Sequence, residues 1–191
     1  MTLPASGNTI SLSQVNTELG RGATATIDMN DSAVRALFQK TGSGTTISMS
    51  DGWGKSNVTI SLATLTSVYG EANNTTATAG LDFNSNGYMS RSSSGYGTVS
   101  MGQWATSSSV GSNYWIRLTQ TSQLGITTVT GAARGVWHQL STTRTFGVST
   151  SALGYGSKTY TVEIASDSGG SNIVASRTGI EIAAENVDQN A

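Results

Sequence analysis

Tyr114-Trp115-Ile116-Arg117-Leu118-Thr119 is the stretch that decides the fold class, because apolar and polar side chains alternate along it with a period of two. Successive side chains of a β-strand point to opposite faces, so the alternation predicts a strand with one buried and one exposed face. The same alternation recurs at residues 160–164 and 180–182. We therefore predict a β-rich fold with Tyr114 and Tyr160 in its core.

Shorter stretches of the same kind surround Val99 and occur at residues 136–140 and 146–148, with glycine-rich breaks between them. About seven or eight short strands in roughly 110 residues match the size of an immunoglobulin-like sandwich. The chain contains no cysteine, so the disulfide of antibody domains cannot form. The fold class that we expect is mainly β, an immunoglobulin-like antiparallel β-sandwich over residues 80–191.

The composition supports an ordered β protein that carries few charges. Only 11% of the residues are charged, against about 25% in an average soluble domain. Ser and Thr together account for 57 of the 191 positions, so hydroxyl groups supply most of the polarity. Disorder would call for few aromatics and a high net charge. The net charge here is −1, and aromatic residues recur through the second half of the chain.

A six-residue pattern occurs three times in the first 56 residues. It consists of Thr, Ile, a short polar residue, Leu or Met, another short polar residue, and Gln or Asp, at residues 9–14, 26–31 and 46–51. Ser, Asp and Asn accept hydrogen bonds from the first free N–H groups of a helix. Each copy therefore predicts an extended segment that runs into a helix start. Ser11 and Gln14 have the spacing of a capping box.

The helices that begin at these starts are predicted to be short. The first should carry an apolar stripe that ends at Gly20, the second should be capped by Asn30 or Asp31, and the third should stop at Gly52-Trp53-Gly54, a turn that exposes the indole. Helices of one to three turns are marginal in isolation. Two interpretations remain open: the helices pack on the rest of the chain, or they dock on a partner.

We favour docking, because residues 71–80 lack apolar periodicity and predict a linker. The expected organisation is a docking segment of extended chain and small helices at 1–56, a connecting strand and linker at 57–79, and the sandwich at 80–191. The residues expected to make the docking contact are Leu12, Val15, Leu19, Leu37, Phe38, Met49 and Trp53.

The candidate catalytic and ligand sites all have simpler explanations. Gly54-Lys55-Ser56 resembles the end of a phosphate-binding loop, but Met49 stands where that loop requires glycine. His138 is the only histidine, and neither a triad carboxylate nor further metal ligands lie near it in sequence. Residues 83–162 hold no acid, so they offer no carboxylate pair for glycoside cleavage. We therefore expect no enzymatic activity, no catalytic residues, no metal and no cofactor.

Outward aromatic side chains are the remaining candidates for binding. Trp115 and Arg117 share the strand face opposite Tyr114, and with Trp104 they form the set that we expect to point outward. An exposed Trp and Arg pair is typical of interface hot spots, and it also suits sugar stacking. We favour contact between subunits, and thus a homo-oligomer, over a host-surface glycan.

The distribution of charged and apolar residues argues against nucleic-acid binding, membrane insertion and a signal peptide. Residues 83–162 hold five bases, which is too sparse for a nucleic-acid surface. No apolar run reaches the roughly 18 residues that a membrane span needs. The first residues lack the basic and apolar regions of a signal peptide. We expect neither nucleic-acid binding nor membrane insertion, and synthesis in a host cytoplasm.

Three blocks in the N-terminal segment resemble the opening module of tailed-phage virion proteins, often described as tail-fibre or minor structural proteins. The blocks are Ile10-Ser11-Leu12-Ser13-Gln14-Val15-Asn16-Thr17-Glu18-Leu19-Gly20, then Asn30-Asp31-Ser32-Ala33-Val34-Arg35, then Ile47-Ser48-Met49-Ser50-Asp51 with Gly54-Lys55-Ser56. A weaker likeness, at residues 137–146 and 161–164, is to a β-rich C-terminal module of phage structural proteins. That module usually has an aliphatic residue where His138 stands.

The resemblance implies attachment to a virion, with other virion proteins as partners and the virion as the location. Because the predicted linker suits a displayed domain, we expect a non-enzymatic structural component associated with the tail, as fibre, baseplate or tail decoration. Two alternatives stay open: a capsid decoration or cement protein, and an adhesin that binds a host-surface glycan.

Overall fold

The chain divides into two compact units, Met1–Thr59 and Ile60–Ala191. Each unit has its own set of buried apolar side chains. The computed structural model describes residues 3–40, 45–55, 58–106, 111–125 and 127–188.

In the described residues of the N-terminal unit, the helices are the short α-helices α1 (Leu12–Glu18) and α2 (Ser32–Leu37) and the 3-10 helix η1 (Met49–Gly52). The predicted capping box is confirmed: the Ser11 N–H donates to Gln14 Oε1 at 2.7 Å, and the Gln14 N–H donates to Ser11 Oγ at 3.2 Å. Asp31 is the cap of α2, where it accepts from the Ala33 N–H at 2.8 Å.

The third copy of the repeat forms a second capping box that the sequence pattern did not reveal. Here the Ser48 N–H donates to Asp51 Oδ2 at 2.8 Å, and the Ser48 side chain accepts from backbone N–H groups of η1. In the second copy, the equivalent Asp28 side chain accepts from the Asn30 N–H at 2.8 Å. In every copy, the side chain of the third residue therefore accepts a hydrogen bond from a backbone N–H two or three residues further along the chain.

The helices of this unit pack on one another. Its core consists of Leu3, Ile10, Val15, Val34, Leu37 and Phe38, with Leu19, Ile27, Met29, Ile47 and Met49 packed against them. The isoleucine of each repeat copy belongs to this set. Backbone hydrogen bonds from Leu3 N–H to Lys55 O and from Gly54 N–H to Pro4 O, both 2.9 Å, join the two ends of the unit. Mutual burial thus offsets the instability of such short helices.

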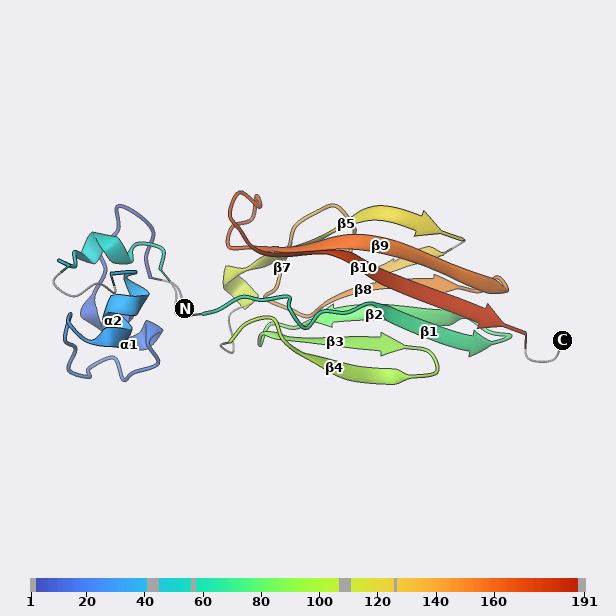
Figure 1. Cartoon of the computed structure of the whole chain (residues 1–191), viewed down its shortest axis with the longest axis horizontal. Helices are drawn as coiled ribbons and strands as arrows, with labels where there is room; N and C mark the ends of the chain where they lie inside the picture. Colours follow the sequence, from blue (N-terminus) through green and yellow to red (C-terminus); the bar gives the residue numbers. More distant parts are fainter. Residues whose placement is uncertain (1–2, 41–44, 56–57, 107–110, 126, 189–191) are drawn as a thin grey trace. The chain divides into compact units, whose positions relative to one another are not determined.

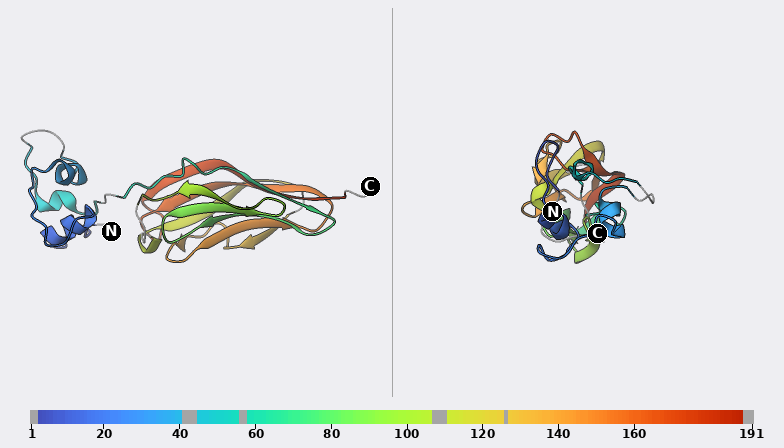
Figure 2. Two further views of the ribbon diagram at one scale, coloured as in Figure 1. Left: turned by 90° about the horizontal axis from the view of Figure 1, so that it is seen from below. Right: turned by 90° about the vertical axis from the view of Figure 1, so that its left-hand side faces the viewer.

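The C-terminal unit is a sandwich of two five-stranded sheets (Figure 1), which Figure 2 shows from two further directions. The first sheet contains, in spatial order, β1 (Val68–Asn73), β10 (Ile173–Val187), β9 (Gly154–Ala165), β5 (Trp115–Leu124) and β7 (His138–Gln139). The second contains β4 (Gly97–Gln103), β3 (Tyr88–Ser93), β2 (Ala77–Phe83), β8 (Arg144–Thr150) and β6 (Thr128–Gly131). A 3-10 turn, η2 (Gly111–Asn113), precedes β5.

The predicted fold class is confirmed: the unit is mainly β, and the strand pairs among its described residues are antiparallel except β1 with β10. Taken in chain order, β2, β5, β6, β8, β9 and β10 fall into the two sheets as strands B to G of an immunoglobulin sandwich do. The β3–β4 hairpin extends one sheet, and β1 joins the other beside its last strand.

The core lies between the sheets, where the alternation places it. Tyr114, Ile116 and Leu118 are buried, and so are Tyr160, Val162 and Ile164 on the neighbouring strand. From the opposite sheet, the Phe83 and Phe146 rings meet edge to face with centroids 6.4 Å apart. The prediction that Tyr114 and Tyr160 belong to the core is confirmed.

The prediction of a linker at residues 71–80 is wrong, because β1 and β2 occupy this region. Ala77 and Ala79, on either side of the exposed Thr78, are almost fully buried. Alanine adds little apolar surface, so its burial leaves a weak periodic signal. Leu62 and Leu65 are buried as well, so the sandwich includes residues that were predicted to form a connection at 57–79.

Acid should destabilise the N-terminal unit through Asp31 and Asp51. The hydrogen bond from the Ala33 N–H, followed by Arg21, lowers the pKa of Asp31, and the hydrogen bond from the Ser48 N–H, with Lys40, lowers that of Asp51. Because both values lie below the unfolded value of 3.8, the stability that these groups contribute is present above that pH. It is lost as the pH falls through the folded pKa.

We expect urea unfolding of the unit, followed by the NMR signal of Val34, to need less urea at about pH 3 than at about pH 6. The difference should shrink in Asp31→Asn, which cannot ionise. Equal midpoints at the two pH values in the wild-type chain would contradict this account of the caps.

Candidate functional site

The predicted docking residues divide into buried and exposed sets. Val15, Leu37 and Phe38 are at most 6% exposed, inside the core of the N-terminal unit. Leu19 and Met49 pack against that core. Leu12 and Trp53 are 48% and 37% exposed, so these two remain available for contact with a partner.

Trp53 is exposed, as the Gly-Trp-Gly turn predicts. Its indole N–H donates to the Asn8 carbonyl at 2.9 Å, which ties the ring to the chain while the residue stays 37% exposed. Gly52 is buried, and a Cβ there would lie 2.8 Å from the Phe38 ring, so the turn can approach the core only with glycine. Lys55 Nζ donates to Gln39 Oε1 at 2.6 Å, and Ser56 lies outside the described residues.

The prediction that Trp104 points outward is wrong. Its side chain is fully buried, its indole N–H donates to the Asn84 carbonyl at 3.0 Å, and its ring meets Tyr114 edge to face. Trp104 follows β4 just after Gly102, which has a φ of +107° and interrupts the regular strand. Alternation cannot assign a face beyond such a break.

Arg117 lies on the outer face of its sheet, but its guanidinium is engaged within the domain. Nε and Nη2 donate to Glu163 Oε2 at 3.0 and 2.7 Å, and the group lies 4.5 Å from the centre of the Trp137 ring. Gly170 approaches Trp137 so closely that a Cβ there would lie 2.2 Å from the ring. Trp115, the predicted partner of Arg117, is half-buried. The arrangement clamps the β9–β10 connection onto the sheet.

His138 has contacts that suit a structural role. Its Nε2 lies 2.8 Å from the Ala133 carbonyl oxygen, and its ring meets Phe146 edge to face. Within the ranges that the structure describes, no group of three or more His, Cys, Asp or Glu side chains is arranged to hold a metal ion.

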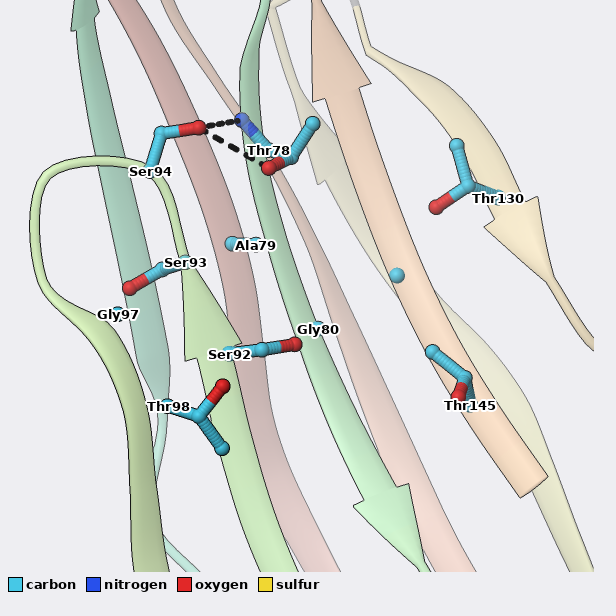
Figure 3. Close-up of a pocket in the computed structure, with 11 residues that line it drawn as sticks. Thr78, Ala79, Gly80, Ser92, Ser93, Ser94, Gly97, Thr98, Thr130 and Thr145 are labelled. Carbon is cyan, nitrogen blue, oxygen red and sulfur yellow. Dashed lines mark hydrogen bonds between the residues drawn. The ribbon is translucent and has the colours of Figure 1, made fainter. Parts of the chain in front are cut away.

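A hollow of about 390 Å³ lies on the outer face of the second sheet (Figure 3). Its lining consists of Ser, Thr, Gly and Ala residues. Ser94 Oγ accepts from the Thr78 N–H at 3.0 Å, and Thr130 and Thr145 stand on the far side. Gly147 forms part of the floor, where a Cβ would lie 2.6 Å from Thr130 Oγ1. With hydroxyl groups as its only side-chain polar groups, this hollow has no acid or base to offer.

A second hollow is lined by aromatic and charged side chains. It is lined by three tyrosines, which are Tyr69 on β1, Tyr96 in the β3–β4 turn and Tyr155 on β9. Arg91 on β3 and Glu181 on β10 line it as well. The Tyr69 ring is stacked with the Tyr155 ring, with centroids 6.4 Å apart, and is tilted relative to the Tyr96 ring, with centroids 6.1 Å apart. We call this set of five residues the tyrosine hollow. It was not predicted from the sequence, because its residues come from four strands and a turn.

Carboxylates hold two of the tyrosines in place. The Tyr69 hydroxyl lies 2.6 Å from Glu185 Oε2 and 2.9 Å from Glu71 Oε2, and these two glutamates are direct partners across β1 and β10. Burial, followed by the hydrogen bonds to both glutamates, raises the pKa of Tyr69. Burial and the hydrogen bond to Glu181, 2.8 Å long, likewise raise the pKa of Tyr155. Both phenols therefore stay protonated donors at neutral pH.

The chain was also compared with known proteins. No protein-family model, no curated protein and no solved structure matches it. None of the helices in the described part of the chain is long and apolar enough to cross a membrane.

The close packing of Gly170 on Trp137 predicts that alanine substitution costs more stability there than at Gly135, although both glycines have a left-handed backbone conformation. Gly170 and Gly135 have φ values of +71° and +76°, but a Cβ at Gly135 meets nothing within 4 Å. Gly135→Ala should cost about 1 kcal/mol from the backbone alone. Gly170→Ala should cost about 3 kcal/mol, because it must also displace the Trp137 ring.

Urea unfolding of the two variants measures both costs, and tryptophan fluorescence should change in Gly170→Ala only. Equal costs with unchanged fluorescence would show that Gly170 does not support the clamp.

Proposed function

We propose that this chain is a non-enzymatic structural component of a tailed-phage virion, associated with the tail and attached through its N-terminal unit. The observation that carries the proposal is the division into two units, each with a core of its own. A small unit that closes its own core can be held by a neighbouring protein without disturbing the domain beside it. The three blocks that resemble the phage module all lie in this unit.

Attachment in this proposal uses the surface of the N-terminal unit. The residues that remain for contact are Leu12, at the start of α1, and Trp53, at the end of η1. Trp is among the residue types that interface hot spots favour. The buried residues of the predicted docking set support the contact only indirectly, because they keep α1 and η1 in place.

The character of the sandwich also supports a structural role. The outer face of the second sheet presents Ser and Thr around its hollow, and Arg117 on the other sheet is tied to Glu163 and Trp137. Such a surface stays in solution with few charges and few long flexible side chains, which suits a part that is packed in many copies. Other virion proteins and further copies of the chain are the partners that we propose.

Removal of residues 1–59 should abolish incorporation into particles and leave the sandwich folded. Full-length chain and the 60–191 fragment would each be supplied with a tag during infection, and purified particles would be probed for the tag. Circular dichroism of the fragment should show a β-rich spectrum and a cooperative thermal transition. Incorporation of the fragment at the wild-type level would contradict attachment through the N-terminal unit, and an unfolded fragment would contradict the separation of the cores.

A finer test uses Trp53→Ala, which should reduce incorporation roughly tenfold or more if the indole is a hot spot. Leu153→Ala is the matched control, because Leu153 is a 61% exposed apolar residue of the sandwich. An equal reduction in both variants would argue against a specific contact at Trp53. A cryo-EM map of the particle then locates the copies, and density confined to capsid junctions would replace the tail by the capsid.

A further inference from the structure

The tyrosine hollow is a built concave site of about 300 Å³, at the lower end of the size range of small-ligand pockets. Two of its rings are open to solvent, with Tyr96 at 59% and Tyr155 at 38% exposure. Ala183 and Val68, both buried, also line it. Contiguous exposed apolar surface is typical of interaction sites, and here the exposed rings gather around one hollow.

The rings are positioned before any ligand arrives. Hydrogen bonds from the Tyr69 and Tyr155 hydroxyls to glutamates on β1 and β10 fix the outer ends of these rings, and the stacking contact of 6.4 Å fixes their faces relative to each other. Little side-chain freedom is then lost when a ligand packs against them. Tyr96, in the β3–β4 turn, completes the wall.

Polar groups of both kinds face the same hollow. Arg91 supplies guanidinium donors, and no hydrogen bond or ion pair ties it to another of the described residues. Glu181 supplies carboxylate oxygens, of which Oε1 accepts from the Tyr155 hydroxyl. Ser67 and Ser93 also line the hollow and carry hydroxyls. The hollow therefore combines flat apolar faces with a free donor and an acceptor.

The balance of charge selects the class of ligand. The lining holds one guanidinium, that of Arg91, and one carboxylate, that of Glu181, so neither a cation nor an anion meets a lining of uniformly opposite charge. A purely apolar ligand would bury Arg91 and Glu181 without partners, which costs more than its contacts return. A neutral ring with C–H groups on its faces and hydroxyls on its edge meets every part of the site.

We propose that the tyrosine hollow binds a neutral saccharide unit, stacked against Tyr96 and Tyr155 and hydrogen-bonded by Arg91 and Glu181. Sugar C–H groups carry partial positive charge and pack on the negative face of an aromatic ring. The guanidinium fork donates to two neighbouring hydroxyls, and the carboxylate accepts from another. This site is separate from the Trp104 and Trp115 positions that alternation had suggested for a glycan, and it does not depend on where the chain is located in a particle.

Saturation-transfer NMR on the full chain tests the proposal, because it detects the weak binding expected of a single sugar. The probes are neutral methyl glycosides of glucose, galactose, mannose and N-acetylglucosamine, with methyl glucuronide and choline as the charged comparisons. We expect transfer to at least one neutral glycoside and to neither charged probe. Transfer to no neutral glycoside, or stronger transfer to a charged probe, would overturn the assignment.

Variants then locate the binding. Tyr96→Ala and Arg91→Gln should each weaken the neutral glycoside by roughly tenfold, as loss of a stacking ring or of a charged hydrogen bond does. Tyr88→Ala is the matched control, since Tyr88 is a 45% exposed tyrosine of β3 outside the hollow, and it should bind as the wild type does. Equal weakening in Tyr96→Ala and Tyr88→Ala, with both folded by circular dichroism, would place the site elsewhere.

Discussion

Closure of a separate apolar interior in each unit is the constraint on which the rest of the structure depends. In the N-terminal unit, three repeat copies each bring an isoleucine to one small core, and capping side chains turn the backbone so that helices of few residues can surround it. In the sandwich, alternate side chains of strands from both sheets, among them β2, β5, β8 and β9, fill the space between the sheets. With so few charges in the chain, apolar burial has to supply most of the stability of both units.

The same closure determines what each surface can present. Because strand side chains alternate, fixing Val68 and Ile182 in the core places Tyr69 and Glu181 on the outer side, and the parallel pairing of β1 with β10 brings Glu71 opposite Glu185. Like charges directly opposite each other on neighbouring strands repel, and the hydrogen bonding of the Tyr69 hydroxyl with both carboxylates relieves part of this repulsion. The tyrosine hollow is thus a consequence of sheet register, whereas the hydroxyl-lined hollow on the other sheet owes its depth to glycine at positions such as Gly147.

Local patterns sufficed for part of this structure and failed for the rest. Alternation identified the core positions of Tyr114 and Tyr160, and capping rules located the starts of α1 and α2. The strand at Ala77–Phe83 was missed because small residues form much of its buried face, and Trp104 was misplaced because Gly102 breaks the strand before it. The tyrosine hollow could not be found from the sequence, since Tyr69, Tyr96 and Tyr155 are brought together by pairings between distant strands that leave no mark in any short window.

The independence of the two interiors can be measured directly by amide hydrogen exchange on the full chain carrying Phe38→Ala. Removal of this buried ring should cost about 3–5 kcal/mol, enough to open a unit of such small size. The account predicts that the amides of Val15 and Val34 lose their protection, while those of Leu118 and Val162 exchange at the wild-type rate. A loss of protection by the same factor at all four amides would show one shared interior and contradict the account.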